Sequence, residues 1–312
     1  MTKTRKEEDK MEEIILQRKL EALGQNGTFV RKDGKTFLQL DCENAKELSM
    51  KWGEKLYPFT KTGKKWILEL PFSTPVNYVQ ICVDGQEVLS PDLPIAHGYC
   101  RPYNYIELPD EEGLFELRDV PHGTLTQEFY KSKISDNWEK LIVYLPPCVP
   151  SAGLPVLYLQ HGFGESEISW STTGKVNFLM DNLIAAGKIK PFAIVMGNGM
   201  VKQRIDGELK LNRALYGQML VEEILPMIEK KYQFGGSKEK RGMAGLSMGS
   251  VQTTRTICAH PELFSEVGIF SGFLRDRIVG DEEHDGIVPK SGGQSYLKAM
   301  DDAAFNTYFH TF

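Results

Sequence analysis

The most specific fold pattern in the sequence is Arg241-Gly242-Met243-Ala244-Gly245-Leu246-Ser247-Met248-Gly249. A β-rich segment enters it, and a run compatible with a helix, residues 251–259, leaves it. A Gly-x-Ser-x-Gly pattern between a strand and a helix places the serine on a sharp, strained turn with its hydroxyl exposed. We therefore predict that Ser247 is a catalytic nucleophile. The alternative interpretation is a plain Gly/Ser turn before a core helix.

The two glycines that flank Ser247 have a steric purpose. Side chains at Gly245 and Gly249 would collide with the neighbouring strand and helix, so both positions require glycine. The first turn of the following helix also points free backbone N–H groups toward a developing oxyanion. We therefore predict that the backbone N–H of Met248 is one of two oxyanion donors.

A second glycine-bearing turn, Gln160-His161-Gly162-Phe163-Gly164-Glu165, follows an apolar strand. Such a turn can aim a backbone N–H at the serine, and we assign this second oxyanion donor to Phe163. His161 could act as a base, but it precedes the serine in the chain and ends a strand, so a structural, hydrogen-bonding role is the preferred interpretation. His161, Gly162 and Trp170 are the candidates for lining the substrate pocket.

Strands and helices alternate through the second part of the chain. We expect strands at residues 141–145, 154–160, 192–196 and 266–270, and helices at 176–186, 220–231 and 251–259. These strands are apolar with few alternating polar positions, which is typical of a parallel sheet covered by helices on both faces. The sequence therefore predicts an α/β domain with a doubly wound, mostly parallel sheet.

Short β segments bounded by turn residues fill the chain from about residue 25 to 112. We expect strands at residues 28–30, 36–40, 48–52, 65–70, 76–83 and 86–89. Asp84-Gly85 lies between the last two and is typical of a two-residue hairpin turn. This spacing predicts a small all-β sandwich, which ends in an extended linker marked by Pro91, Pro94, Pro102 and Pro109.

The charged N-terminal residues 1–24 carry apolar side chains at helical spacing and end at Gly24, so we predict a short amphipathic helix there. Four aromatic residues of the sandwich could stack on sugars, although core packing is the preferred interpretation for most of them. They are Trp52, Trp66, Tyr103 and Tyr105.

Composition limits the classes of partner. The net charge is −5 and the sequence pI is about 5.8, which argues against nucleic acid or an anionic membrane as the main partner. No apolar run reaches the roughly 18 residues that a membrane span needs, and no secretory signal pattern is present in this numbering, so we expect a cytoplasmic protein, with secretion after removal of a signal as the alternative. The five cysteines are scattered without CxxC spacing, which indicates reduced thiols rather than disulfides or a metal site.

From about residue 117 to 312 the chain resembles the esterase family that contains enterochelin esterases and feruloyl and acetyl xylan esterases. The resemblance lies in residues 175–187, 191–196, 223–229, 244–250 and 260–268. It implies the α/β-hydrolase fold and a Ser/Asp/His triad that cleaves acyl groups esterified to sugars, or related small esters, with no cofactor or metal. His260 matches a position inside the helix after the serine turn, which implies a structural role.

The front domain resembles the immunoglobulin-like modules, related to starch-binding domains, that precede such esterases. This second resemblance is carried by Tyr78, by Val83-Asp84-Gly85 and by Ser90-Pro91-Asp92. It implies a role in shaping the substrate entrance or in homodimer formation, with carbohydrate binding as a further alternative.

The acid and histidine of the implied triad have no matching positions. The family places its acid after the strand that would correspond to residues 305–312, and its histidine further on. His284 stands in an acidic loop, His310 lies within the final strand, and Asp301 and Asp302 end a helix, so none of the four fits the role. Residues 305–312 would also form an exposed apolar edge strand, which invites aggregation. We therefore expect an incomplete chain whose acid and histidine lie beyond Phe312.

The leading hypothesis is a serine esterase that removes feruloyl or acetyl groups from carbohydrate esters through an acyl-enzyme on Ser247. The expected ligand is a small ester or an acylated oligosaccharide. Two alternatives stay open: a catalytically impaired homologue that acts as a binding module, and an esterase of siderophore-type esters.

Overall fold

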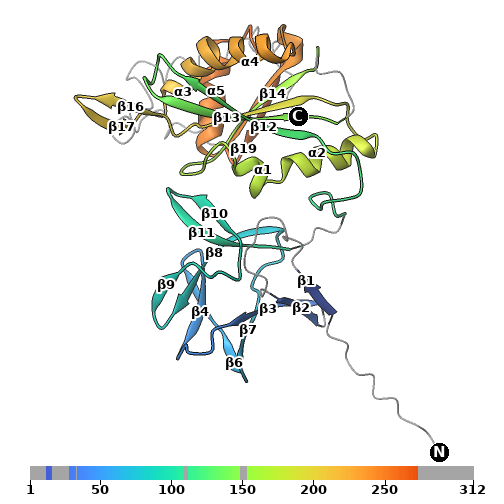
Figure 1. The fold of residues 1–312 in the computed structure, drawn as a ribbon, viewed down its shortest axis with the longest axis vertical. Helices are drawn as coiled ribbons and strands as arrows, with labels where there is room; N and C mark the ends of the chain where they lie inside the picture. The colour runs from blue at the N-terminus through green and yellow to red at the C-terminus, as the bar shows by residue number, and fades with distance from the viewer. Residues whose placement is uncertain (1–11, 16–27, 33, 109–111, 148–152, 273–312) are drawn as a thin grey trace, which may run out of the picture. The chain divides into compact units, whose positions relative to one another are not determined.

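The computed structural model describes residues 12–15, 28–32, 34–108, 112–147 and 153–272. The chain forms two compact units. The first comprises Met1–His97 and Arg101–Gly113, and the second comprises Gly98–Cys100 and Leu114–Phe312, in each case as far as the residues are described (Figure 1). Each unit has its own apolar core.

The first unit contains two antiparallel sheets. One sheet has the order β1 (Glu12–Ile15), β2 (Thr28–Lys32), β3 (Lys35–Asp41), β7 (Lys65–Glu69) and β6 (Thr60–Thr62). The other has the order β10 (Ile95–Gly98), β11 (Arg101–Glu107), β8 (Val76–Val83), β4 (Leu48–Trp52) and β5 (Lys55–Pro58), with β9 (Gln86–Val88) paired to β8. Leu38 and Trp66 of the first sheet share a buried cluster with Met50 and Ile81 of the second. The two sheets therefore pack as a sandwich.

Core packing accounts for two of the four aromatic residues considered for sugar stacking. Trp66 and Tyr105 are buried, and the Trp66 indole N–H donates to the carbonyl oxygen of Cys42 at 2.9 Å. Trp52 is half-buried and its ring lies 5.0 Å from that of Phe72. These rings stabilise the sandwich by filling its core.

Two sequence expectations for this unit are wrong. The helix expected over residues 1–24 is contradicted at Glu12–Ile15, which form strand β1 in antiparallel register with β2, and the remaining residues of that range lie outside the described residues. An isolated short helix is marginal in water, whereas pairing with β2 satisfies the backbone groups of this segment.

The proline-rich linker expected after residue 90 is instead part of the second sheet. Strands β10 and β11 lie in this segment, and Pro102 precedes Asn104, the first residue of β11 in register with β8. The fully buried Asn104 accepts a hydrogen bond from the backbone of Ser90 and donates to the carbonyl oxygens of Ser90 and Leu93. These bonds satisfy buried backbone groups of the segment that leads into β10.

The second unit is built on a six-stranded mixed sheet. Its order is β12 (Thr124–Lys131), β13 (Trp138–Leu145), β15 (Ala193–Gly197), β14 (Val156–Gln160), β18 (Arg241–Leu246) and β19 (Glu266–Phe270). Strands β12, β13 and β15 pair antiparallel, and β15, β14, β18 and β19 pair parallel. The strands predicted in this region are confirmed, each within a few residues.

Helices cover both faces of this sheet (Figure 1). One face carries α1 (Ser169–Thr172) and α2 (Val176–Ala185); the other carries α3 (Leu215–Met219), a π-helical turn (Leu220–Ile224), α4 (Leu225–Tyr232) and α5 (Met248–Ala259). A 3-10 turn (Lys238–Lys240) precedes β18, and a hairpin of β16 (Lys202–Ile205) and β17 (Glu208–Leu211) lies between β15 and α3.

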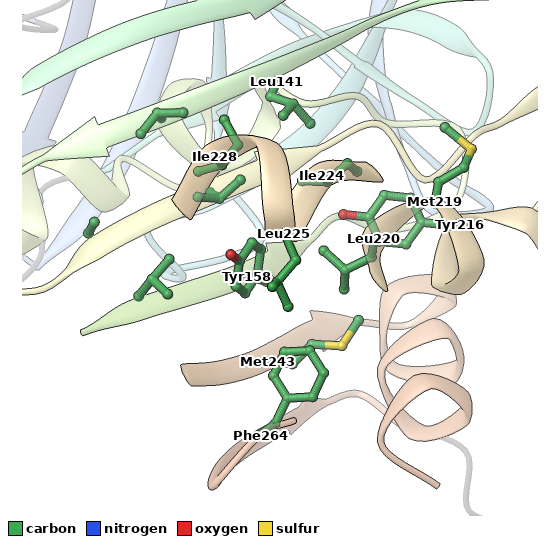
Figure 2. Packing of buried hydrophobic residues seen from close by; sticks show 14 of the residues in the cluster. Leu141, Tyr158, Tyr216, Met219, Leu220, Ile224, Leu225, Ile228, Met243 and Phe264 are labelled. Carbon is green, nitrogen blue, oxygen red and sulfur yellow. The ribbon is translucent and has the colours of Figure 1, made fainter. Parts of the chain in front are cut away.

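Alternate residues along the strands point to opposite faces of the sheet and contribute to two apolar clusters, one on each face. Leu141 and Val143 of β13 join the cluster beneath α3 to α5, whereas Ile142 and Tyr144 join the cluster beneath α2. Figure 2 shows the first cluster, in which the helix residues Leu220, Ile224 and Ile228 pack over the sheet. The π-helical turn ends just before Pro226, whose missing N–H interrupts the regular helical ladder.

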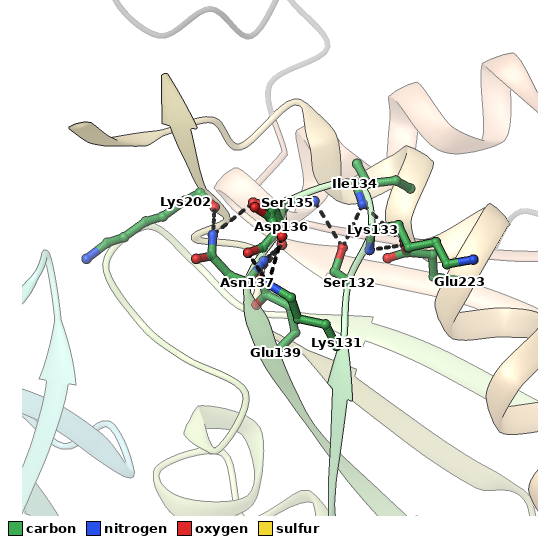
Figure 3. Close-up of polar contacts among 10 residues, drawn as sticks. All are labelled: Lys131, Ser132, Lys133, Ile134, Ser135, Asp136, Asn137, Glu139, Lys202 and Glu223. Carbon is green, nitrogen blue, oxygen red and sulfur yellow. Dashed lines mark hydrogen bonds and ion pairs between the residues drawn. The ribbon is translucent and has the colours of Figure 1, made fainter. Parts of the chain in front are cut away.

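The turn between β12 and β13 is fixed by polar contacts (Figure 3). The Glu223 carboxylate accepts the backbone N–H of Lys133 at 2.7 Å, and the Ser132 hydroxyl accepts that of Ser135 at 3.0 Å. The Asn137 side chain donates to the carbonyl oxygen of Lys202 at 2.7 Å. The turn is thereby tied both to the π-helical segment and to the base of the β16–β17 hairpin.

Candidate active site

Ser247 occupies the sharp turn between β18 and α5. Its backbone has φ 52° and ψ −110°, a conformation that non-glycine residues rarely adopt. The Ser247 N–H donates to the carbonyl oxygen of Phe270 at 2.9 Å, which anchors the turn to the end of β19. The serine therefore stands at the carboxyl ends of the parallel strands, where α/β sheets place their functional sites.

The glycines on either side make this turn sterically feasible. A Cβ atom on Gly245 would lie 2.2 Å from the carbonyl oxygen of Gly249, and one on Gly249 would lie 2.7 Å from that of His161. Both distances are far shorter than any normal contact, so neither position tolerates a side chain. The collisions with helix α5 and with the end of β14 are those expected from the sequence.

Helix α5 begins immediately after the serine. The Ser250 hydroxyl donates to the carbonyl oxygen of Ser247 at 2.6 Å, and the backbone N–H groups of Ser250 and Val251 point to the same oxygen. Met248 is the first residue of α5, and its N–H therefore has no partner within the helix. The structure thus places the predicted donor Met248 beside the serine with its N–H at the positive end of the helix.

The second predicted donor, Phe163, lies in the loop at residues 161–165, after β14. Its carbonyl oxygen accepts the backbone N–H of Tyr99 at 3.2 Å, and the Gly164 carbonyl accepts that of Cys100 at 3.3 Å. The Gly164 N–H points to the sulfur of Met200 at 3.4 Å. None of these bonds uses the backbone N–H of Phe163.

The His161 imidazole is buried and both its ring nitrogens are engaged. Nε2 accepts the backbone N–H of Gly199 at 2.9 Å, so Nδ1 carries the proton and donates to the carbonyl oxygen of Gly162 at 2.8 Å. Burial lowers the pKa of His161 below its ordinary value, which keeps the ring neutral. The residue joins the loop after β14 to the loop after β15, and neither nitrogen is available to a serine.

Gly162 and Trp170 hold the same region in place. The Gly162 N–H donates to the Glu165 carboxylate at 2.8 Å, and the Trp170 indole N–H donates to the carbonyl oxygen of Gln160 at 2.9 Å. The Trp170 ring lies 6.0 Å from the ring of Phe270, which is 46% exposed at the end of β19. This aromatic pair stands next to the serine turn and was not anticipated from the sequence.

Two further residues that sequence reasoning missed are Arg213 and Gln252. The Arg213 guanidinium lies 4.8 Å from the centre of the Phe163 ring. Gln252 is buried on α5 and its side chain donates to the carbonyl oxygens of Gly199 and Arg213 at 2.9 and 3.1 Å. The buried face of α5 is itself largely polar, so no break in an apolar pattern marks Gln252, and Arg213 likewise has no local pattern that marks it.

The other described histidines of the second unit contact residues other than Ser247. His122 pairs with Asp181 at 2.9 Å, and His260 pairs with Glu262 beyond the far end of α5, roughly 18 Å along the helix axis from Ser247. Within the described ranges of this unit, no histidine bonds to the Ser247 hydroxyl. The four weighed substitutes, His284, His310, Asp301 and Asp302, lie outside the described residues.

Among the described residues, no three His, Cys, Asp or Glu side chains group so as to hold a metal ion. In the same part of the chain, no helix has the length and apolar character required to cross a membrane.

A strained serine turn between a parallel strand and a helix, faced by a glycine-bearing loop at the end of the neighbouring strand, defines the α/β-hydrolase class. A family model described as "Putative esterase" matches residues 132–308, and the chain belongs to this esterase family. A curated relative, the endo-1,4-beta-xylanase/feruloyl esterase of Xylanibacter ruminicola, is 32% identical over 264 residues, or 80% of this chain. The alignment covers 36% of that relative, so the chain spans about a third of its length.

Solved structures share the fold. The enterobactin esterase of Shigella flexneri, in the presence of enterobactin, has a TM-score of 0.59 and 12% identity, over 83% of this chain and 76% of that one. The same enzyme with 2,3-dihydroxy-N-benzoyl-glycine has a TM-score of 0.57 and 12% identity, over 90% and 89%. The α/β-hydrolase fold expected from the sequence is confirmed, while the immunoglobulin-like character of the first unit stays a prediction.

Proposed function

We propose that this protein is a serine carboxylic-ester hydrolase whose nucleophile is Ser247. The Oγ atom adds to the ester carbonyl carbon, and the tetrahedral intermediate then expels the alcohol, which takes up a proton. A covalent acyl-serine ester remains. Water adds to the same carbon, the acid is released, and the serine regains its proton, so one ester bond and one water molecule are consumed in each turnover.

The oxyanion of each tetrahedral intermediate is held by the backbone N–H groups of Phe163 and Met248. Met248 supplies the free N–H at the start of α5, and the loop after β14 supplies the N–H of Phe163. One such donor contributes roughly 10²–10³-fold to kcat in related chemistry. The observation that most strongly supports Ser247 as the nucleophile is its strained backbone conformation, which is flanked by two positions that only glycine can occupy.

The base that activates Ser247 lies outside the described residues. His161 has both ring nitrogens engaged, His122 is paired with Asp181, and His260 is at the opposite end of α5. A serine hydroxyl needs such a base, because it is a weak nucleophile when it keeps its proton.

We propose that the substrate is a carbohydrate ester, and that a feruloyl ester is preferred to an acetyl ester. Support comes from the exposed aromatic rings of Phe163 and Phe270 beside the serine turn, which suit an aromatic acyl group. The name of the Xylanibacter relative, which joins a xylanase to a feruloyl esterase, points the same way. Siderophore-type esters are the second candidate, and only likeness in fold favours them.

The test compares hydrolysis of methyl ferulate, acetylated xylan and a tri-ester siderophore by this chain and by Ser247→Ala. We expect methyl ferulate to be cleaved with the highest kcat/KM and the variant to lose at least about 10³-fold in kcat. Ser265→Ala, at the opposite end of β19, is the matched control and should keep wild-type activity. Unchanged turnover by Ser247→Ala would refute the nucleophile. A folded wild-type chain that cleaves none of the three esters would contradict the proposed activity of these 312 residues.

A further inference from the structure

The loop that carries Phe163 is held mainly by backbone hydrogen bonds, which use the carbonyl oxygens of Phe163 and Gly164 and the N–H of Gly162. Residues 162–164 contain two glycines, and Gly164 has φ +75°. Phe163 therefore carries the only large side chain in residues 162–164. Its ring is 38% exposed, so burial in the core does not fix it.

Arg213 adds a side-chain restraint to these backbone bonds. It lies between β17 and α3, its side chain is buried, and its guanidinium stacks 4.8 Å from the centre of the Phe163 ring. A cation over an aromatic face is attracted to the ring quadrupole, and the attraction strengthens when the pair is shielded from water. The guanidinium plane also fits flat against an aromatic ring in a way that an ammonium group cannot.

The backbone of Arg213 is itself held by the helix that follows the serine. The Gln252 amide on α5 donates to the Arg213 carbonyl oxygen at 3.1 Å and to that of Gly199 at 2.9 Å. The Gly199 N–H in turn donates to His161. A continuous set of contacts therefore runs from α5 through Arg213 to the ring of Phe163, and a second runs from α5 through Gly199 to the start of the same loop.

We infer that Arg213 is a positioning residue that sets the Phe163 N–H against the Met248 N–H. The two donors belong to different elements, the end of β14 and the start of α5, and an oxyanion needs both at hydrogen-bond distance. Displacement of one donor by about 1 Å is enough to lose much of its contribution. This inference rests on the proposed function of the same site.

Four variants test the inference: Arg213→Met, Arg213→Lys, Phe163→Leu and the double variant Arg213→Met/Phe163→Leu. Leucine at position 163 removes the aromatic face but keeps the backbone N–H. The matched control is Arg204→Met on β16, which removes the same charge from an exposed arginine whose guanidinium donates to Gly207. Each protein is assayed for kcat and KM with 4-nitrophenyl acetate, for binding of phenylboronic acid and ferulate, and for its unfolding midpoint.

Arg213→Met should lower kcat about tenfold with KM changed less than about twofold, because the lost interaction is made mainly in the transition state. Affinity for phenylboronic acid, whose tetrahedral serine adduct places an oxygen in the oxyanion site, should fall by a similar factor, while ferulate affinity should not. Phe163→Leu should match the loss of kcat with 4-nitrophenyl acetate, the double variant should add little to either single variant in kcat, and Arg213→Lys should recover part of the activity. Ferulate affinity is compared for the Arg213 variants alone, because the Phe163 ring itself belongs to the proposed aromatic acyl site.

Three outcomes would overturn the inference. Multiplicative losses in the double variant would mean that Arg213 and Phe163 act independently. An equal loss in Arg204→Met would mean that Arg213 acts through its charge at long range. A lowered unfolding midpoint with kcat and boronate affinity both intact would leave Arg213 a purely structural role. Failure of the proposed function itself is separate, because it would appear as wild-type turnover by Ser247→Ala.

Discussion

Gly249 faces the carbonyl oxygen of His161 so closely that a Cβ atom on the glycine would come within 2.7 Å of that oxygen. The first residue of this pair belongs to the helix that presents Ser247, and the second begins the loop that carries Phe163. Their contact fixes the serine turn and the second oxyanion donor against each other. Both halves of the proposed site therefore depend on the absence of one side chain.

The substitution Gly249→Ala should push the start of α5 away from the loop that begins at His161. The added methyl group cannot be accommodated without a shift of α5 or of the end of β14, so we expect a loss of about 1–3 kcal/mol in the free energy of unfolding. We also expect a decrease in kcat of at least about tenfold, because the donors move apart. Chemical denaturation and ester hydrolysis measure the two effects. Thr254→Ala, on the same helix, is the control, and a Gly249→Ala enzyme with wild-type kcat would contradict the argument.

His161 should make stability depend on pH in a definite direction. Burial lowers its pKa in the folded state below the ordinary value of 6.5, so the unfolded chain binds a proton more readily than the folded one. Its contribution is therefore present above about pH 6.5 and is lost as the pH falls below that value. The free energy of unfolding should decline there by at most about 1.4 kcal/mol per pH unit through this residue.

The check is a comparison with His161→Gln, whose amide does not titrate. The variant should be less stable than the wild type at pH 8, because it cannot reproduce both hydrogen bonds of the imidazole. Its stability should fall less steeply between pH 6.5 and 5. Parallel curves for the two proteins would show that His161 does not remain neutral in the fold.

Asp181 should matter for stability and not for chemistry. Its buried carboxylate accepts the Tyr144 hydroxyl at 2.6 Å and the Gly123 N–H at 3.0 Å, and it pairs with His122 at 2.9 Å. Asp181→Asn should lower the free energy of unfolding by about 2–3 kcal/mol, since partners are left unsatisfied inside the fold. Because α2 covers the face opposite α5, kcat should stay within about twofold of the wild type.

Asp136→Asn is the matched control for that change. Asp136 pairs with Lys131 at the surface, and its backbone has φ 55°, which asparagine tolerates. We expect an unchanged unfolding midpoint for this variant. Equal midpoints for Asp181→Asn and the wild type would contradict the assigned role of the buried network.

Phe270 should distinguish aromatic from small acyl groups. Its ring is 46% exposed and packs against Trp170, beside the turn whose N–H its carbonyl accepts. Phe270→Ala should raise KM for methyl ferulate about three- to tenfold, the loss of one aromatic contact, and leave KM for an acetyl ester unchanged. Phe129→Ala, an exposed phenylalanine on edge strand β12, is the control. Equal changes for both esters would argue against an aromatic acyl site.

Sequence patterns predicted the structural features that are formed by residues close together in the chain. The strand–turn–helix context of Ser247 and the glycine-bearing turn after β14 are each encoded within a few residues, and both appear in the structure where the sequence indicated. The same holds for the hairpin at Asp84-Gly85, because its two strands are adjacent in the chain.

Features that depend on distant partners escaped prediction. Glu12–Ile15 have helical spacing but pair with β2, and the proline-rich segment joins a sheet because β8 and the side chain of Asn104 complete its hydrogen bonds. Arg213 reaches Phe163 across fifty positions of sequence, and nothing near either residue indicates the contact. Tertiary context of this kind overrides local propensity and cannot be read from spacing.

Trapping the acyl-enzyme would show directly whether Ser247 is the nucleophile. The 312-residue chain is mixed with excess 4-nitrophenyl ferulate, quenched in acid within the first turnovers, digested, and examined by peptide mass spectrometry. Our account predicts one feruloyl group, attached to the peptide that contains Ser247, and none in Ser247→Ala. A feruloyl group on a different residue, or ester hydrolysis by the wild type that Ser247→Ala matches, would contradict it.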